Sequence, residues 1–231
     1  MFPLEVITPF IAVSLFVELL IYYFAEGSPS DLRMQIFGGL LMLMTLFFNP
    51  AYVISGLAHV ARSADMTVFE ASMFGSWRDV AVARTLSLLI YMTPYAIMQA
   101  IVTYLVSSLC LLGPYVIMGV VLSIYLYSGI ALSLSLIRSR TATILTSALT
   151  LFMAPISVAI LFLNYGTFHA KLSGVVAVMT YVLNPSLTYW YAITTNSVTV
   201  SPSLGLMACA FVMVAMYVVF LKWFDRVEIK V

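Results

Sequence analysis

Residues 65–84, DMTVFEASMFGSWRDVAVAR, form a polar interruption between long apolar runs. On a helical projection of residues 65–77, large apolar side chains recur at spacings of three and four: Met66, Phe69, Met73 and Trp77. The polar residues of the same stretch take the other side: Asp65, Ser72 and Ser76. The pattern predicts an amphipathic helix over about residues 62–78 that lies at a membrane surface.

The chain around this interruption has the composition of a membrane protein. Apolar residues make up 63% of it, charged residues only 8%, and the mean hydropathy is +1.10, values that exclude an ordinary soluble domain. A spanning helix needs about 20 apolar residues. We therefore predict an all-α, polytopic membrane protein with one domain over residues 1–231. Its expected spans are about 6–25, 35–59, 79–108, 113–137, 142–164 and 204–224.

The basic residues predict the orientation of these spans, because cytoplasmic loops carry an excess of Lys and Arg. With the N-terminus in the cytoplasm, only Arg33 and Lys171 fall outside. The other basic residues fall on or near the inner side: Arg62, Arg78, Arg84, Arg138, Arg140, Lys222, Arg226 and Lys230. We expect both termini and the 62–78 helix to be cytoplasmic.

The region 165–203 is too long for a simple turn and too apolar for an ordinary loop. Its stretch LSGVVAVMTYVL, residues 172–183, has about 12 residues, which is too short to cross the membrane. A re-entrant or interfacial pair of short helices on the outer side is therefore predicted. Tyr189, Trp190 and Tyr191 follow, and such amphipathic rings favour the level of the lipid headgroups.

Glu70 falls within the apolar face of the 62–78 helix. A buried or half-buried carboxylate needs a cation or several hydrogen-bond donors. The nearest candidates in sequence are Arg62, Arg78 and Arg84. One interpretation is an interfacial helix that only anchors a loop, with Glu70 held against an arginine.

A second interpretation comes from a family resemblance. The stretch TVFEASMFGSWRDVAVARTLSLLIYMTPYAI, residues 67–97, resembles the first cytoplasmic connector of ABC-2 type transporter permeases. In that family a Gly-Thr-Leu-Glu-like turn leads through a short helix to a basic residue that opens the third span. Residues 67–70 stand for this turn, and Arg84 stands for the basic residue. Met66 replaces the usual glycine, and Gly75 and Ser76 stand where a proline is usual.

The resemblance implies the membrane subunit of an ABC transporter, with exporter function in a prokaryotic plasma membrane. Its connector would be a coupling helix that docks on a cytoplasmic ATPase subunit, and two permease copies would form a homodimer around the route in contact with membrane lipid. The coupling residues implied are Phe69, Glu70, Met73, Phe74, Trp77 and Arg78. Relatives of this class export varied cargo, so the substrate stays open.

The sequence lacks the motifs of an enzyme. It contains no G-x-x-x-x-G-K-[ST], so ATP and Mg²⁺ are expected on the partner ATPase and no cofactor on this chain. It also contains no H-E-x-x-H and no G-x-S-x-G. His59 and His169 fall on opposite sides of the membrane in the predicted topology, which excludes a shared metal or catalytic pair. No metal site and no nucleic-acid partner are predicted.

Two polar residues stand inside predicted spans. The free-energy cost of inserting Glu18 into the membrane is offset by the apolar residues of the same span, so insertion is feasible. We expect its carboxyl group to be protonated or paired. It either lines a pathway or dimer seam, or is a satisfied interior acid. A self-contained ion- or proton-coupled carrier that uses Glu18 is the alternative function. Asn49 precedes Pro50, which predicts a kink.

Cys110 and Cys209 both fall towards the outer ends of their spans. A disulfide between them is geometrically conceivable. Two cysteines in apolar helices are more often packing residues, and this interpretation is favoured.

Overall fold

The computed structural model describes residues 4–60, 69–70, 72–73, 75–136, 141–152, 182–194 and 202–228. Every regular element in these residues is helical, and none of them is a strand. The predicted all-α class is therefore confirmed for this part of the chain.

The first two helical segments form a long antiparallel pair. Helix α1 covers Leu4–Glu26, and after a short turn the chain returns through α2 (Ser30–Leu43), a π-helical turn η1 (Met44–Phe48) and α3 (Asn49–Val60). Pro50 has no backbone N–H and its ring crowds the carbonyl four residues earlier, so regular α-helical hydrogen bonding fails there. The predicted distortion thus takes the form of a wider turn directly before α3.

The next two segments are a long helix and a shorter one that are joined by a short turn. Helix α5 covers Trp77–Leu109 and α6 covers Pro114–Leu134. Pro94 lies inside α5 and removes one backbone hydrogen bond. Beside it, the Thr93 hydroxyl donates to the Leu89 carbonyl at 2.8 Å, so a side chain adds a hydrogen bond within the interrupted turn.

Three further helices complete the described chain. A helix at Thr141–Phe152 begins the predicted fifth span. Helix α9 covers Pro185–Thr194, inside the predicted re-entrant region 165–203, and α10 covers Pro202–Glu228. The remainder of the fifth span and most of the predicted re-entrant region lie outside the described residues.

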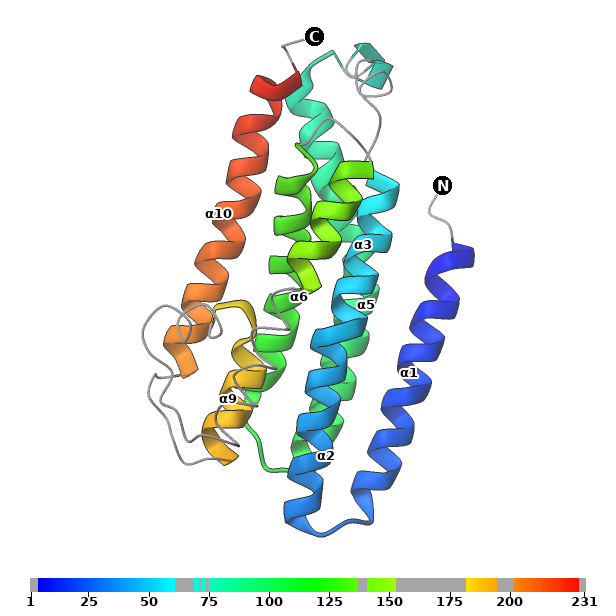
Figure 1. The fold of residues 1–231 in the computed structure, drawn as a ribbon, viewed down its shortest axis with the longest axis vertical. Helices are drawn as coiled ribbons and strands as arrows, with labels where there is room; N and C mark the ends of the chain where they lie inside the picture. The colour runs from blue at the N-terminus through cyan, green and yellow to red at the C-terminus, as the bar shows by residue number, and fades with distance from the viewer. Residues whose placement is uncertain are drawn as a thin grey trace.

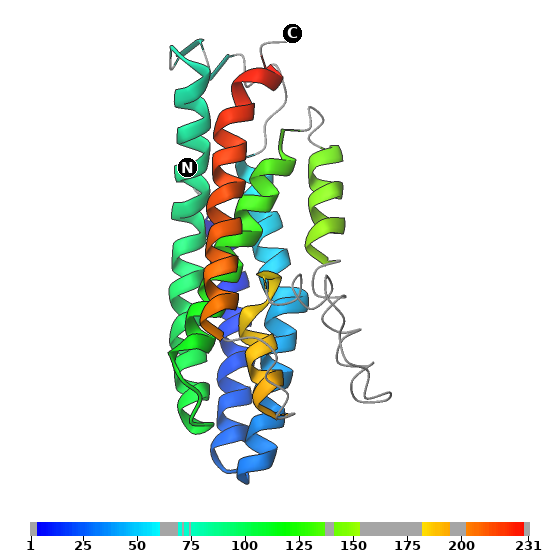
Figure 2. The same cartoon turned by 90° about the vertical axis from the view of Figure 1, so that its left-hand side faces the viewer.

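The long helices run lengthwise through one bundle (Figure 1). Helix α1 begins and α10 ends toward the same end, where residues 69–70 and 72–73 also lie, and the turns that join α1 to α2 and α5 to α6 lie at the opposite end (Figures 1 and 2). Figure 2 places the Thr141–Phe152 helix on the side of the bundle away from α5. Below, the segment formed by residues 69–70 and 72–73 is called the connector, and the end of the bundle where it lies is called the connector end.

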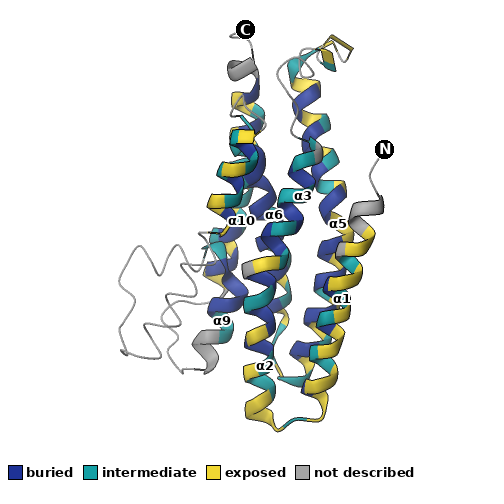
Figure 3. Ribbon diagram, turned by 45° about the vertical axis from the view of Figure 1, so that its right-hand side comes forward, coloured by how far each residue is buried: buried dark blue, intermediate teal, exposed yellow. Residues whose placement is uncertain are grey.

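The bundle has a central helix and a peripheral one. Helix α6 packs against α3, α5, α9 and α10, whereas α1 packs mainly against α2 and α5. Figure 3 accordingly shows burial through the middle of the bundle and exposure along α1. The exposed apolar side chains of α1 include Val13, Phe16, Leu19, Leu20, Tyr23 and Phe24. The outer face of α1 is therefore suited to lipid or to another apolar surface.

Three of the described helices are long and apolar enough to cross a membrane: Trp77–Leu109, Pro114–Leu134 and Ser203–Phe224. They correspond to the predicted spans 79–108, 113–137 and 204–224. The membrane character of the protein rests on these three helices.

Helix α9 is seated in the bundle by close packing against small residues. Trp190 lies against Gly38 of α2, where any Cβ atom would collide with the indole ring, and its Nε1 donates to the Met34 carbonyl at 3.0 Å. Ser186 lies equally close to Gly119 of α6. Glycines at these contacts let the helices approach as they do between membrane helices. Trp190 is thus partly enclosed by helices.

Candidate functional site

The connector is joined to the bundle by an ion pair. Arg84 of α5, one of the predicted partners, donates from Nη2 to Glu70 Oε2 at 3.1 Å. The same guanidinium carbon lies 5.3 Å from the centroid of the Phe224 ring in α10. A cation over an aromatic face adds electrostatic attraction to the packing. One arginine therefore links the connector, α5 and α10.

Aromatic side chains extend this joint. The Trp77 ring lies 6.5 Å from that of Phe224, which in turn lies 5.3 Å from Phe220. Phe220 and Phe224 are buried, and Trp77 packs against the core they belong to. Trp77 is therefore a supporting residue of the joint. We call Glu70, Trp77, Arg84 and Phe224 the connector joint.

The predicted coupling helix over 62–78 is interrupted within its last turn. Residues 69–70 and 72–73 are helical, but Gly75 has a φ of 81°, a left-handed conformation that ends a helix and favours glycine. Ser76 then caps α5: its Oγ accepts from the Asp79 N–H at 3.1 Å and donates to Asp79 Oδ2 at 2.6 Å. Trp77 and Arg78 consequently belong to α5, which corrects the predicted boundary.

The remaining predicted coupling residues differ in exposure. The exposed fractions of Phe69 and Met73 are 57% and 71%, and Arg78 is exposed as well. Phe74 and residues 61–68 lie outside the described residues. Glu70 thus faces the bundle, while two large apolar side chains of the same short segment face away from it.

A second site lies in the interior, between α1 and α5. Glu18 is fully buried, and its Oε1 accepts from the Ser14 hydroxyl at 2.8 Å and from Gln99 Nε2 at 2.6 Å. Gln99 and Ser14 are fully buried too. In the part of the chain that the structure describes, the contacts of Glu18 are with neutral groups and none is with a cation.

The polar network continues from Gln99 across the bundle to α3. Tyr95, one turn before Gln99, donates its hydroxyl to Asn49 Oδ1 at 2.8 Å and interacts electrostatically with Glu18. Its ring stacks on Tyr52 at a centroid distance of 4.3 Å. The Tyr52 hydroxyl donates to the Tyr91 carbonyl at 3.0 Å, in the turn that Pro94 interrupts. Asn49, a predicted pathway residue, is thus a buried acceptor.

Three buried atoms around Glu18 have no hydrogen-bond partner in the described part of the chain: Glu18 Oε2, Gln99 Oε1 and Thr103 Oγ1. Buried polar atoms are paired in the great majority of cases, so each exception needs an explanation. Thr103 lies one helical turn beyond Gln99 and therefore on the same face of α5. Two of these atoms, Glu18 Oε2 and Gln99 Oε1, belong to side chains that already share a hydrogen bond between α1 and α5.

The sequence identified Glu18 and Asn49 but not the residues that join them. Ser14 precedes Glu18 by four residues and Tyr95 precedes Gln99 by four, the spacing that places side chains on one helical face. This spacing of polar groups inside apolar runs was a usable signal. Which helix faces α1 could come only from the structure.

Comparison with known protein families, characterised proteins and solved structures found no match to this chain. The functional argument therefore rests on the geometry of the connector joint and of the interior network.

Helix α9 starts at another buried polar contact. Asn184, immediately before α9, is buried, and its Oδ1 accepts from the Tyr127 hydroxyl of α6 at 2.7 Å. The Asn184 carbonyl accepts from the Thr188 hydroxyl at 2.8 Å. The contact fixes where α9 begins relative to the central helix.

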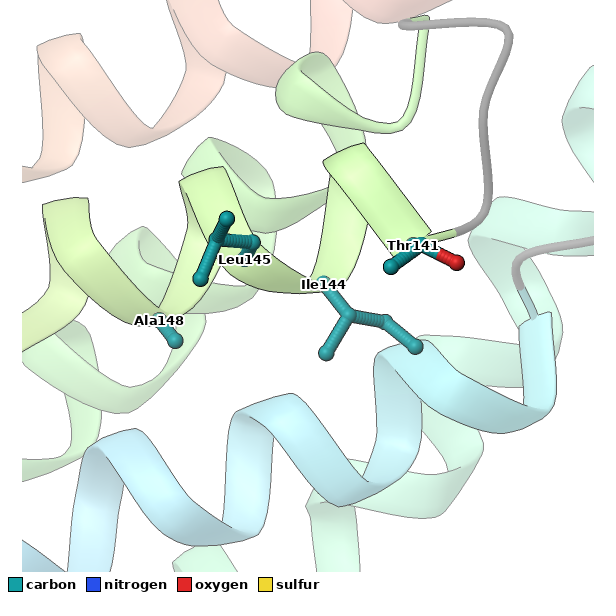
Figure 4. A pocket seen from close by; sticks show the side chains of 4 residues that line it. All are labelled: Thr141, Ile144, Leu145 and Ala148. Carbon is teal, nitrogen blue, oxygen red and sulfur yellow. The ribbon is translucent and has the colours of Figure 1, made fainter.

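A groove of about 470 Å³ lies beside the Thr141–Phe152 helix and is lined by Thr141, Ile144, Leu145 and Ala148. Figure 4 shows the four side chains on this one helix, with Ile144 extending toward the ribbon of α3. Among the described residues, the lining is apolar apart from the Thr141 hydroxyl.

Both cysteines are free thiols, so the favoured interpretation of unpaired cysteines agrees with the structure. Cys209 is buried in α10. Burial raises the pKa of the Cys110 thiol at the end of α5, and the positive charge of Arg33 acts in the opposite direction. A thiol with a raised pKa is a poor nucleophile.

Proposed function

We propose that this chain is the membrane permease subunit of an ATP-driven ABC transporter, with exporter function. The observation that supports the proposal is the connector joint. Glu70 holds the connector on the bundle through Arg84, while Phe69 and Met73 of the same segment remain exposed. Exposed aromatic and methionine side chains are typical of protein interfaces. The occupant proposed for this surface is a cytoplasmic ATPase.

The proposal places six spans in a prokaryotic plasma membrane, with both termini cytoplasmic. Helix α5 has 33 residues and therefore a length of about 50 Å, against about 30 Å for the hydrocarbon core. Its first turns, with Arg78 and Arg84, then reach the connector end, where Lys222 of α10 also lies. Arg33 lies near the opposite end, at the start of α2. This distribution fits a cytoplasmic connector end.

The connector joint offers a route for force. Closure of two ATPase copies on binding ATP and Mg²⁺ would move the two connectors, and each movement would pass through Arg84 to α5 and through Phe224 to α10. Since α5 and α10 both pack against α6, the movement would reach the centre of the bundle. Two permease copies with the route between them complete the proposed assembly.

The proposal is tested by purifying the tagged chain from its native membrane in mild detergent and identifying what accompanies it by mass spectrometry. We expect a stoichiometric ATPase that carries a P-loop. Phe69→Ser with Met73→Ser should lose this partner and its stimulated ATP hydrolysis. Because both side chains are exposed, the free energy of unfolding of the permease should change by less than about 0.5 kcal/mol. Its melting temperature should therefore stay close to that of the unmodified protein.

Leu111→Ser is the matched control. Leu111 is 95% exposed, but it lies in the turn at the end of the bundle opposite the connector. This variant should retain the ATPase. Loss of the ATPase in both variants would point to general damage, and absence of any ATPase from a folded preparation would reject the proposal.

The self-contained carrier remains the second candidate, and the observation that favours it is the buried Glu18, whose hydrogen-bond partners among the described residues, Ser14 and Gln99, are neutral. A carrier would transport its substrate in vesicles without ATP and would depend on an ion gradient. Reconstitution of the chain alone therefore separates the two functions.

A further inference from the structure

The α1–α5 interface contains an incomplete pair of hydrogen bonds. A carboxyl group and a primary amide can form two hydrogen bonds in a closed ring, one from the amide N–H to the carboxyl and one from the carboxyl O–H to the amide oxygen. The first bond is present, from Gln99 Nε2 to Glu18 Oε1 at 2.6 Å. The two atoms of the second, Glu18 Oε2 and Gln99 Oε1, are both buried and have no hydrogen-bond partner among the described residues.

We propose that Glu18 and Gln99 form a proton-binding site in which a proton on Glu18 Oε2 is donated to Gln99 Oε1. One proton satisfies two buried acceptors and removes a charge that no described cation balances. Ser14 supports the arrangement, because its hydroxyl donates to Glu18 Oε1 and its Oγ accepts from Gln99 Nε2 at 3.3 Å.

A metal cation fits the same atoms less well. Hard cations take about six or more oxygen ligands. Here Glu18 Oε1 already accepts from Gln99 Nε2 at 2.6 Å and from the Ser14 hydroxyl at 2.8 Å, and two of its close neighbours are therefore donors, which a cation would repel. A proton needs only the two unpaired atoms.

The site lies at the contact that holds α1 to the bundle. Separation of α1 from α5 would admit water to the carboxyl group, which would then release its proton to the solvent. The titratable group of α5 nearest in sequence to Gln99 is Tyr95, one helical turn before it, whose hydroxyl donates to Asn49 Oδ1. The titratable groups of α2, Asp31 and Arg33, lie in its first turns. Proton occupancy and the α1–α5 contact are therefore linked.

Infrared spectroscopy of the purified full chain at neutral pH tests the site. The carbonyl stretch of a protonated carboxylic acid is separate from the carboxylate bands. We expect this stretch in the unmodified protein, its loss in Glu18→Gln and its retention in Glu26→Gln, which changes an exposed acid on the same helix. Absence of the stretch from the unmodified protein, or its retention in Glu18→Gln, would overturn the proposal.

Gln99→Leu provides an independent variant. It keeps the acid and removes its partner, so the carbonyl stretch should persist and move to higher frequency as a hydrogen bond is lost. An unmoved band would show that Gln99 is not the partner and would overturn the pairing. Carboxylate bands that respond to sodium at constant pH would instead identify a cation site and also overturn it.

The pH dependence of thermal stability supplies a second readout. If the folded state holds a proton that the unfolded state releases, stability falls as pH rises, and the folding equilibrium constant changes up to tenfold per pH unit. Glu18→Gln should remove this slope, because two amides can form the same ring without a titrating group. Glu26→Gln should keep the slope, and equal slopes in all three proteins would reject the site.

Discussion

The two glutamates that this bundle encloses are stabilised in different ways. Glu70, at the connector end, is only half-buried and is paired with Arg84 at 3.1 Å. Glu18 is fully buried, and its contacts are with Ser14 and Gln99. A carboxylate near the surface can stay ionised when one cation pairs with it, whereas an unpaired charge deep in an apolar bundle has a high free-energy cost. The first site is suited to hold two bodies together and the second to bind a proton.

The two sites also differ in what they join. The connector joint brings together the connector, α5, which follows it directly, and α10, which is distant in sequence. The interior network joins peripheral α1 to α5 and then continues to α3 through Tyr95 and Asn49. Variants at the two sites should therefore differ in how much they lower thermal stability. The following changes are ordered by the size of the expected effect.

The largest effect is expected for Glu18→Lys. An ammonium group would enter a fully buried position, where insertion scales place its cost at roughly 3 kcal/mol. It would also bring only donors to a site whose neighbours, Ser14 and Gln99, now donate to residue 18. We expect little monodisperse protein in detergent and a strongly lowered melting temperature.

Glu18→Gln is the matched comparison and should melt close to the unmodified protein. If Gln and Lys are equally damaging, an ionised carboxylate is required at this position. That result would remove the distinction between the two glutamates.

An intermediate effect is expected from breaking the connector joint. Thermal unfolding of Glu70→Ala, Arg84→Ala and the double variant gives the coupling energy of the pair, for which we expect about 1–2 kcal/mol. Arg84→Ala should be the more damaging single change, because it also removes the contact with Phe224. A coupling energy near zero would show that the joint does not hold the connector.

Arg78→Ala is the control for this cycle. Arg78 is exposed in the first turn of α5, six residues before Arg84 in the same helix. We expect a change within about 0.5 kcal/mol. A large effect would indicate that the positive charge at this end, and not the pairing with Glu70, is the stabilising factor.

Much of the fold followed from the sequence because apolar run length and turn residues are local signals. The helical class and the positions of α5, α6 and α10 were predicted within a few residues. The predicted C-terminal end of the 62–78 helix was wrong for a local reason. The apolar spacing continues through Trp77, and the positive φ of Gly75 was not anticipated. Six spans remain a prediction.

The sites were predicted less completely, because they depend on contacts between distant segments. Arg84 was a named partner for Glu70, but Phe224, separated from it by most of the chain, carried no signal that assigned it to the joint. Similarly, Glu18 stood out as an acid in an apolar helix, whereas Gln99 became significant only once α1 was placed against α5. Such contacts between residues distant in sequence cannot be predicted from a single sequence.

The smallest effect is expected for Tyr95→Phe, which tests whether the interior network extends beyond Glu18. The change keeps the ring stacked on Tyr52 but removes the hydroxyl that donates to Asn49 Oδ1 at 2.8 Å. Loss of one neutral hydrogen bond costs about 1 kcal/mol, measured as a lower melting temperature. Tyr23→Phe removes a hydroxyl from a residue that is 74% exposed and should change nothing.

Adding Asn49→Leu to Tyr95→Phe distinguishes a broken hydrogen bond from general damage. Replacing both partners by apolar groups removes the unpaired acceptor, so the double variant should be more stable than Tyr95→Phe alone. If instead the two losses add, the hydroxyl and the amide act independently. The network would then end at Gln99, and the proton proposed at Glu18 would be confined to the α1–α5 interface.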